Sequence, residues 1–427
     1  SKITKELDSD LNKLEKIILN TNEEGSELAS LLLRSFFKNK PSDWKNFIEK
    51  AIDKKEYVLD KETKHSITFH LKDDLFSTDV FECKILKSEK ELETMIKEYL
   101  DIKFAHKAFS EELKQKPNNS VVEPLFLGRI NFEGKEVIAM ASMKRILGKR
   151  ADEFLRDINN KGLGVYEENK NFIKEIINFQ RVLTKRFYNE KYYSLEEFSN
   201  EKYFNQKFFD RLENLVNDKN FGSKEIYREI EKTKKSSALK EFLELEKEVN
   251  NPKYFVVVHG DAVTSNIIKY LKENKNIKVS FTTFYDFKLM LATPNFDIYS
   301  YVEDPRNLLC ENKKIKLISE SYRELIKNRL FLGSENDFLK SYLLIQNLRD
   351  FCTGVMFIDY ALNTSDQDER EYFLKNAKYF IQRNINNNYI FSKGINLKPK
   401  EAELLFNYEY EFLKLKQELL NNVESMI

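Results

Sequence analysis

The chain of 427 residues has little of what usually reveals a function from composition. Its three cysteines, Cys83, Cys310 and Cys352, are too few and too scattered for a disulfide framework, and no pair has the C-x-x-C spacing of zinc or redox motifs. Among its four histidines, His65 and His70 are close in sequence but have no cysteine at zinc-site spacing. A histidine-rich metal site is therefore not expected.

The chain also lacks an excess of charge of either sign. It has 71 Lys and Arg against 70 Asp and Glu, so its net charge of +1 removes the overall electrostatic case for nucleic acid or an anionic membrane. No apolar run approaches the ~18 residues of a membrane span. The first residues have no apolar signal-peptide core, so we expect a cytoplasmic protein. With 41% hydrophobic and 33% charged residues, the chain is expected to fold.

Glycine is also scarce, with only 11 residues in the chain. Few glycines mean few tight turns and little room for a glycine-rich loop of the kind that cradles phosphates.

The pattern of hydrophobic residues divides the chain into three regions. Residues 1–55 show helical periodicity, with Ser42 or Asp43 as a cap for one helix, and are predicted to form an N-terminal helical extension. Residues 56–146 read as short strands, one amphipathic helix over 88–109, and further strands. Residues 147–427 are predicted to be mainly helical, with strands at 254–258 and 279–285. The Lys/Asn/Glu-rich stretch Lys272–Lys278 indicates either a loop or a compositional bias.

The strongest local signal follows the strand at 254–258. There the chain reads His259-Gly260-Asp261, with Asn266 five residues after the aspartate, and Asp286 stands at the end of the next predicted strand. Phosphoryl transfer requires one carboxylate to orient the attacking hydroxyl, and an amide oxygen with a second carboxylate to hold Mg²⁺. Asp261, Asn266 and Asp286 supply these groups, and a hairpin-like pair of strands would bring their tips together.

This motif resembles the catalytic loop (258–268) and metal-binding loop (284–290) of the protein-kinase-like superfamily. The His-Gly-Asp opening and the Thr264-Ser265-Asn266 run are similar to its aminoglycoside phosphotransferase and choline kinase branch, and also to the small atypical kinase of the KEOPS complex. The resemblance implies a two-lobed α+β fold, with a small antiparallel-sheet N-lobe at 56–146 and a large helical C-lobe at 147–427. It also implies Asp261 as catalytic residue, Asn266 and Asp286 as metal ligands, and His259 and Asp297 as structural supports of the site.

A weaker resemblance extends upstream. Lys84, on a predicted strand, is similar to the lysine that binds nucleotide phosphates, and a helical glutamate should pair with it. Glu98 is the first choice for that glutamate and Glu93 the second. The segment from Val137 to Met143 resembles the strand before the hinge, and Lys144-Arg145-Ile146 resembles the hinge that meets the adenine with backbone groups. The implied nucleotide-binding residues are Met143, Lys144 and Ile146.

The sequence departs from the family pattern in two places. No glycine-rich loop lies between the first two strands, where residues 63–66 are the best substitute, so phosphates would be held by Lys84, backbone amides and magnesium. The Asp-Phe-Gly triplet of the family is Asp286-Phe287-Lys288 here, which disfavours a swinging activation segment.

The resemblance thus implies an ATP- and Mg²⁺-dependent phosphotransferase with a hydroxyl acceptor, a small molecule of the aminoglycoside, choline or sugar kind. The long interval between Ile146 and His259 favours this branch, because such enzymes insert helices there to build a substrate cleft. Two alternatives stay open: a protein Ser/Thr kinase, and a nucleotide-binding pseudokinase that serves as a scaffold. Glu303 and Asp304 could line a pocket for a cationic substrate or simply be solvated.

Overall fold

The computed structural model describes residues 42–62, 66–71, 79–88, 91–113, 121–145, 149–189, 195–217, 221, 224–274, 277–386 and 395–427. The chain forms two compact units. The first contains the residues up to Glu196 together with Val257–Met290, and the second contains Glu197–Val256 and Leu291–Ile427. A small antiparallel sheet and a large set of helices confirm the predicted fold class. The boundaries proposed from sequence for the two lobes stay a prediction.

The first unit is built on a five-stranded antiparallel sheet with strand order β1-β2-β3-β5-β4. The strands predicted in the region before residue 87 are confirmed, because β-branched and aromatic residues alternate there with polar ones. The strands are β1 (Tyr57–Glu62), β2 (Ser66–Leu71), β3 (Asp79–Leu86), β4 (Glu123–Phe132) and β5 (Lys135–Arg145).

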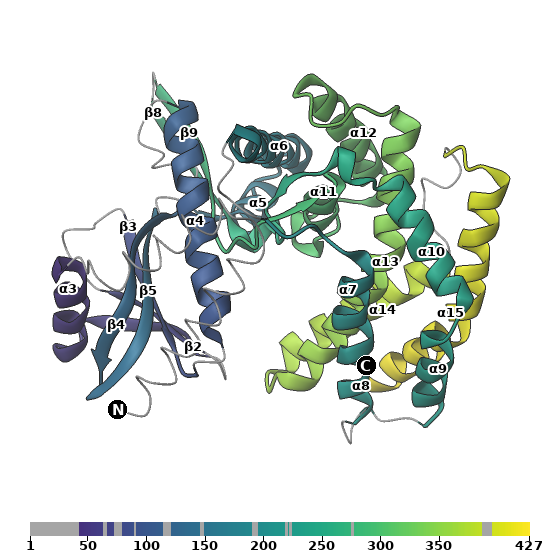
Figure 1. Cartoon of the computed structure of the whole chain (residues 1–427), viewed down its shortest axis with the longest axis horizontal. Helices are drawn as coiled ribbons and strands as arrows, with labels where there is room; N and C mark the ends of the chain where they lie inside the picture. The colour runs from purple at the N-terminus through teal and green to yellow at the C-terminus, as the bar shows by residue number, and fades with distance from the viewer. Residues whose placement is uncertain are drawn as a thin grey trace. The chain divides into compact units, whose positions relative to one another are not determined.

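Two helices flank this sheet, α3 (Ser42–Asp53) and α4 (Leu92–Leu113) (Figure 1). Ile48 of α3 is fully buried and packs with Phe69, Cys83 and Ile85 in one hydrophobic cluster. Because side chains alternate along a strand, Lys84 points to the opposite face of the sheet from Cys83 and Ile85. Helix α3 is the described part of the predicted N-terminal extension, whose residues 1–41 lie outside the described residues.

The rest of the first unit carries the predicted catalytic and metal-binding loops. Strands β8 and β9 form an antiparallel hairpin, which β6 extends. Of the two interpretations of Lys272–Lys278, the loop is wrong, because β8 continues to Asn274 and β9 starts at Ile277. The elements are β6 (Lys149–Arg150), α5 (Ala151–Asn160), α6 (Val165–Asn189), η5 (Thr264–Asn266), β8 (Ile267–Asn274) and β9 (Ile277–Phe284). Strands β7 (Val256–Val258) and β10 (Met290–Ala292) lie where the chain passes from one unit to the other.

The second unit is helical, as the sequence predicts for most of the chain after residue 296. Its described helices and helical turns are α7 (Asn200–Phe204), η3 (Asn205–Phe209), α8 (Asp210–Val216), α9 (Lys224–Lys234), α10 (Ser237–Val249), η4 (Pro252–Tyr254), α11 (Asn295–Val302), η6 (Pro305–Asn307), α12 (Glu311–Lys327), α13 (Glu335–Asn363), α14 (Gln367–Ile385) and α15 (Pro399–Met426). None of the described helices is long and apolar enough to cross a membrane.

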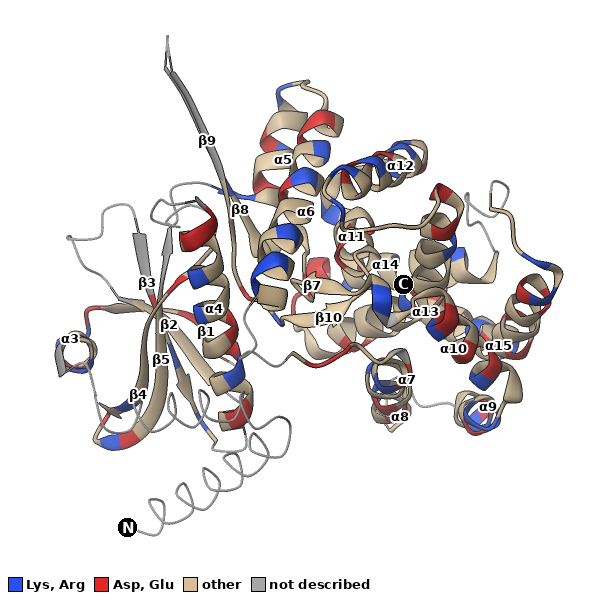
Figure 2. Cartoon of the chain, turned by 45° about the horizontal axis from the view of Figure 1, so that its top comes forward, with Lys and Arg blue, Asp and Glu red and all other residues tan. Residues whose placement is uncertain are grey.

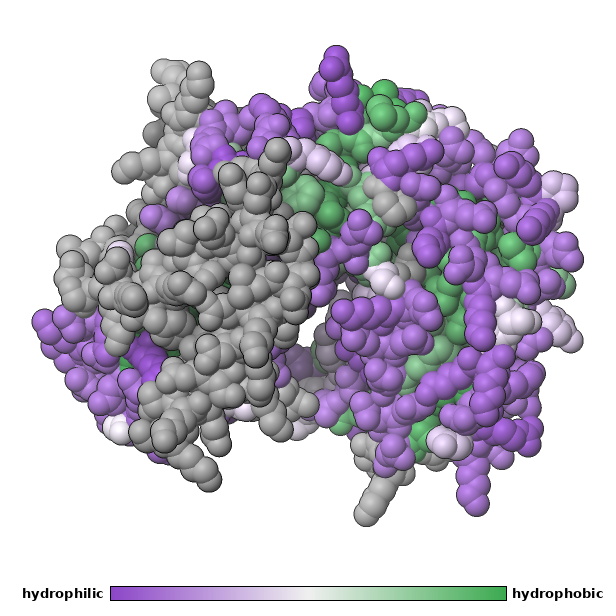
Figure 3. Space-filling model, in the orientation of Figure 1, coloured by the Kyte–Doolittle hydropathy of each residue, from purple (hydrophilic) through white to green (hydrophobic). Residues whose placement is uncertain are grey.

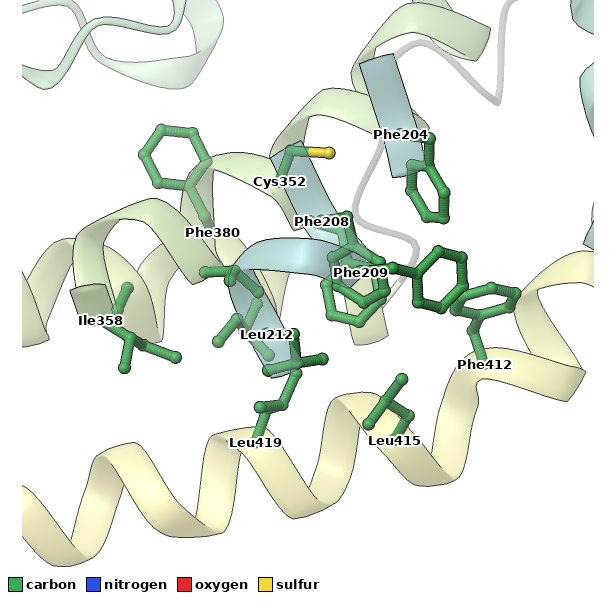
Figure 4. Packing of buried hydrophobic residues seen from close by; sticks show 14 of the residues in the cluster. Phe204, Phe208, Phe209, Leu212, Cys352, Ile358, Phe380, Phe412, Leu415 and Leu419 are labelled. Carbon is green, nitrogen blue, oxygen red and sulfur yellow. The ribbon is translucent and has the colours of Figure 1, made fainter. Parts of the chain in front are cut away.

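An aromatic core holds these helices together. Phe208 lies 4.3 Å from Phe351 of α13 between ring centroids, and Phe204 packs on Phe412 of α15 (Figure 4). Leu415 and Leu419 extend the cluster along α15. The face of this unit that Figure 3 shows is mostly hydrophilic, as expected when the large apolar side chains are turned inward. Lys and Arg alternate with Asp and Glu along its helices in Figure 2, which matches the balanced net charge.

A buried network of charges ties α11, α12, α13 and α14 to one another. Arg383 donates to Glu303 at 2.6 Å and to Asp350 at 2.8 Å, and Lys314 donates to Glu303 at 2.9 Å. Glu303 is therefore buried and paired with two cations. Asp304 is also buried, and it accepts a hydrogen bond from the Arg306 guanidinium, so neither carboxylate is simply solvated. Charges withdrawn from water are stabilised only when they are paired in this way.

A different buried charge lies in the aromatic core. Lys416 of α15 is 1% exposed, and its ammonium lies 5.3 Å from the ring centroid of Tyr408 and 5.6 Å from that of Phe351. Burial lowers the pKa of Lys416 from its ordinary 10.5 to about 8, although Glu409 and Asp350 oppose the shift. Between these two values the unfolded chain binds more protons than the folded chain, so the stability contribution of this residue improves as pH rises.

We expect Lys416→Met to stabilise the protein at pH 7, by up to about 3 kcal/mol, because the variant no longer buries an amine that the unfolded chain protonates easily. The gain should shrink toward pH 10. Denaturant unfolding of both proteins at the two pH values measures it. Lys400→Met, at an exposed position of the same helix, is the control and should change little. A gain that is the same at both pH values would contradict the burial of a protonated amine.

Candidate active site

The predicted catalytic loop leaves the buried strand β7 at His259. The His259 ring is fully buried, and its Nδ1 accepts a hydrogen bond from the backbone N–H of Asp261 at 3.2 Å. The rings of Phe179, Phe284 and Phe287 surround the imidazole at 5.3–5.9 Å between centroids. These contacts are the kind that a bracing residue makes, because the histidine fixes the backbone of the aspartate from within the core.

Gly260 has no possible substitute at its place in the loop. Its φ of +82° lies in the left-handed region, and a Cβ there would be 2.2 Å from the carbonyl oxygen of Lys288. On the other side of the same junction, the N–H of Lys288 donates to the carbonyl of His259 at 2.8 Å. The backbone of the catalytic loop thus lies directly against the backbone that follows Asp286.

Asn266 closes the catalytic loop on Asp261. Its Nδ2 donates to the backbone carbonyl of Asp261 at 2.9 Å and to the Asp261 carboxylate at 3.2 Å. The N–H of Val263 donates to the same carbonyl at 2.8 Å. The intervening turn, Thr264–Asn266, is one turn of 3₁₀ helix, which sets the five-residue spacing between the two side chains.

The β8–β9 hairpin brings Asn266 and Asp286 to one end of a strand pair. Ile267 pairs with Phe284, and the N–H of Tyr285 donates to the carbonyl of Asn266 at 3.3 Å. The Tyr285 hydroxyl also donates to the carbonyl of Ser265. Asp286 is exposed and has a φ of +57°, a conformation that aspartate tolerates better than most residues.

Lys84 and Glu98 form an ion pair. Lys84 Nζ lies 2.6 Å from Glu98 Oε2, and the two side chains are 27% and 17% exposed, so neither is simply solvated. Of the two glutamates considered from sequence, Glu98 is the partner, whereas Glu93 is exposed in the first turn of α4.

The carboxylates around Lys84 outnumber the cation that they surround. Burial alone would lower the pKa of Lys84, but Glu98, with help from Asp286 and Glu82, raises it. Burial raises the pKa of Glu98 despite Lys84, and Asp286 and Glu82 add to that rise. Lys84 and Asp286 are therefore close enough to influence each other, and the site carries more negative than positive charge before any ligand binds.

The remaining predicted site residues lie at the end of β5, outside the described residues, or in the second unit. Met143 and Lys144 lie in the last part of β5, and Ile146 and residues 63–65 lie outside the described residues. Asp297 is fully buried in α11 of the second unit, and its bracing role stays a prediction.

Sequence reasoning missed two residues of α4, Lys97 and Asp101. Asp101 is 1% exposed and accepts from the N–H of Leu289 at 3.1 Å, while Lys97 donates to the carbonyl of Leu289 at 3.0 Å and to Asp101 at 2.7 Å. The sequence contains only a partial signal: Asp101 follows Glu98 by three residues and so falls on the same side of the helix, but nothing in it indicates a backbone partner at Leu289.

The chemistry of the donor set fits magnesium. Mg²⁺ prefers carboxylate and carbonyl oxygens, which Asp286 and the amide of Asn266 supply. Because Asn266 uses its Nδ2 on Asp261, its Oδ1 is the atom left for a cation. An excess of carboxylates around Lys84 also suits a site that receives a metal together with an anionic phosphate chain.

Residues 172–322 match the family model described as the ecdysteroid kinase-like family. This stretch includes Asp261, Asn266, Asp286 and Asp297. The match confirms the resemblance to kinase-like phosphotransferases predicted from sequence, and with it the predicted class of enzyme, a kinase that phosphorylates an alcohol group.

No curated protein matches the sequence. Among solved structures, the chain is similar to an ethanolamine kinase from Plasmodium vivax, with 13% identity and a TM-score of 0.38. The alignment covers 76% of this chain and 82% of that chain. This likeness is too distant to support a conclusion about function.

We expect Gly260→Ala to lower the melting temperature and to abolish any nucleotide-dependent activity. A methyl group cannot occupy the space that the Lys288 carbonyl fills, so the catalytic loop and the metal-binding loop would have to separate. Thermal unfolding and an activity assay test this. Gly164→Ala is the matched control, because nothing lies within 4 Å of its added methyl group. Unfolding temperatures that fall equally in both variants would show that the close approach at Gly260 does not matter.

Proposed function

We propose that the chain transfers the γ-phosphate of ATP to a hydroxyl of a small molecule in a Mg²⁺-dependent reaction. One observation carries the proposal: Asn266 is hydrogen-bonded to Asp261 and lies at the same hairpin end as Asp286. A general acid–base carboxylate and two metal ligands are thus available from one short stretch of chain.

Each residue has a distinct role in this proposal. Asp261 orients the acceptor hydroxyl and takes its proton, and it acts mostly by positioning, because the transition state of phosphoryl transfer is loose. Lys84 contacts the phosphates and is held by Glu98. Asn266 and Asp286 hold Mg²⁺, which when bound neutralises charge on the phosphates. His259 braces Asp261 from the core, and Asp297 has the supporting role that the resemblance implies.

The nucleotide would extend from the end of β5 to Lys84. Strand β5 pairs with β3 so that Met140 lies opposite Lys84 and Lys144 lies opposite Val80. The two positions on β5 are about 13 Å apart at the rise of an antiparallel strand. That span suits a nucleotide whose base meets backbone groups of Met143, Lys144 and Ile146 and whose phosphates reach Lys84.

The class of acceptor is the part of the proposal that most needs an experiment. Aminoglycosides, choline, sugars and, because of the family model, a polyhydroxylated steroid of the ecdysteroid kind form the panel, with generic proteins as a separate arm. Incubation with γ-labelled ATP and Mg²⁺ distinguishes the alternatives. Label on a small molecule supports the proposal, and label on protein alone supports a Ser/Thr kinase. A nucleotide-dependent rise in melting temperature without any transfer would favour a pseudokinase scaffold.

We expect Asp286→Ala to reduce MgATP-dependent turnover by on the order of a hundredfold or more, because it removes a charged metal ligand. The fold should persist, since Asp286 is exposed. Asp286→Asn tolerates the left-handed backbone and should lose activity as well, which separates the loss of charge from backbone strain. Asp53→Ala, at an exposed position of α3, is the control for charge alone. Retained turnover in Asp286→Asn and Asp286→Ala would refute the assignment.

We expect Glu98→Gln to weaken nucleotide-dependent turnover by roughly tenfold, because Lys84 would lose the partner that orients it. Glu93→Gln, on an exposed turn of the same helix, should leave turnover unchanged. Combining Glu98→Gln with Lys84→Met should cost little more than Lys84→Met alone, since contacting residues are not additive. Fully additive losses in this cycle would mean that the ion pair has no part in the reaction.

A further inference from the structure

Helix α4 contacts the predicted metal-binding segment at a point that the proposed reaction does not require. Leu289, three residues after Asp286, is 1% exposed, and both of its backbone polar groups are bonded to α4. Its N–H donates to Asp101 Oδ2 at 3.1 Å, and its carbonyl accepts from Lys97 Nζ at 3.0 Å. We call these two side chains and the Leu289 backbone the α4 clamp.

The α4 clamp is internally completed by an ion pair. Lys97 Nζ lies 2.7 Å from the same Asp101 oxygen that accepts from Leu289. A buried carboxylate needs such partners, because an uncompensated charge in the interior is costly. Removal of the Lys97 or the Asp101 side chain should therefore break its own bond to Leu289 and also weaken the bond made by the other side chain.

The clamp is on the same turn of α4 as Glu98. Residues three and four apart share one face of a helix, so the turn that contains Lys97, Glu98 and Asp101 reaches both Lys84 and Leu289. One rigid helical turn thus fixes the distance between the phosphate-binding lysine and the backbone beyond Asp286. All of these residues belong to the first unit.

The residue before Leu289 is bonded to the predicted catalytic loop. Lys288, between Asp286 and Leu289, donates to the carbonyl of His259 and approaches Gly260. Lys288 is thus bonded to the loop at His259, and Leu289 is bonded to α4, so the backbone conformation of this segment is fixed at two successive residues. Lys288, which replaces the glycine of the Asp-Phe-Gly triplet, is not among the described residues with a positive φ, so this path does not require a glycine there.

We propose that Asp101 is a positioning residue that sets the place of the metal ligand Asp286 through the backbone of Leu289, with Lys97 as its partner. The inference rests on the proposed function, because it assigns a role toward the metal that the proposed function requires. A residue that holds a ligand from behind typically changes metal affinity by roughly 10- to 100-fold. Asp101 does not itself touch the reacting atoms in this assignment.

The test measures how much Mg²⁺ is needed for binding, with no turnover involved. The melting temperature of the full chain is followed in a non-hydrolysable ATP analogue while Mg²⁺ is titrated. We expect the half-maximal Mg²⁺ concentration to rise roughly tenfold in Asp101→Ala. Asp101→Asn keeps an oxygen for the Leu289 N–H and should recover most of the affinity. Lys97→Ala loses the exposed arm of the clamp and should be intermediate.

Lys103→Ala, at another exposed lysine of α4, is the matched control and should titrate like the parent. If Asp101→Ala does not fold, Lys97→Ala and Asp101→Asn still decide the question, because each leaves part of the clamp in place. Variants that melt earlier but titrate with Mg²⁺ like the parent would show a purely structural role and overturn the inference. A parent protein with no Mg²⁺-dependent shift in the presence of the analogue would instead refute the proposed function.

Discussion

The site depends on one close approach between two backbone segments, at Gly260 and Lys288. The absent side chain of Gly260 lets the Lys288 carbonyl come within a distance that no Cβ allows, and the Lys288 N–H bonds to His259. Asp261 lies one residue to one side of this junction and Asp286 two residues to the other. Their relative position is therefore set by main-chain hydrogen bonds, which are less adaptable than contacts between long side chains.

The scarcity of glycine takes on a different meaning once this junction is known. A glycine-rich loop provides backbone amides for phosphates, whereas Gly260 provides room for another backbone. In the proposed function, the phosphates are instead bound by Lys84, a cation that is surrounded by Glu98, Asp286 and Glu82. Under the proposed function, such a site would repel an isolated triphosphate and accept it together with a divalent cation, so the proposed need for a metal and the missing glycine-rich loop would follow from one electrostatic arrangement.

The parts of the site that could be predicted from sequence are those that are local in sequence. The five-residue step from Asp261 to Asn266 is a property of one turn, and the path from Asn266 to Asp286 is a single hairpin. The choice of Glu98 over Glu93 was harder, because both are glutamates of one amphipathic helix and only the packing of α4 on the sheet separates them. Asp101 was not foreseen, since its partner Leu289 is distant in sequence and contributes backbone atoms.

Backbone partners explain why the remaining residues escaped prediction. A side chain that binds another side chain leaves a trace of complementary charge, as Lys84 and Glu98 do, but any residue can offer an N–H and a carbonyl. Buried charges paired across helices, such as Glu303 with Arg383, give the same difficulty, because a highly charged sequence offers many equivalent candidates. In this chain the motif identifies the chemical groups, and the fold decides which of many charged side chains hold them in place.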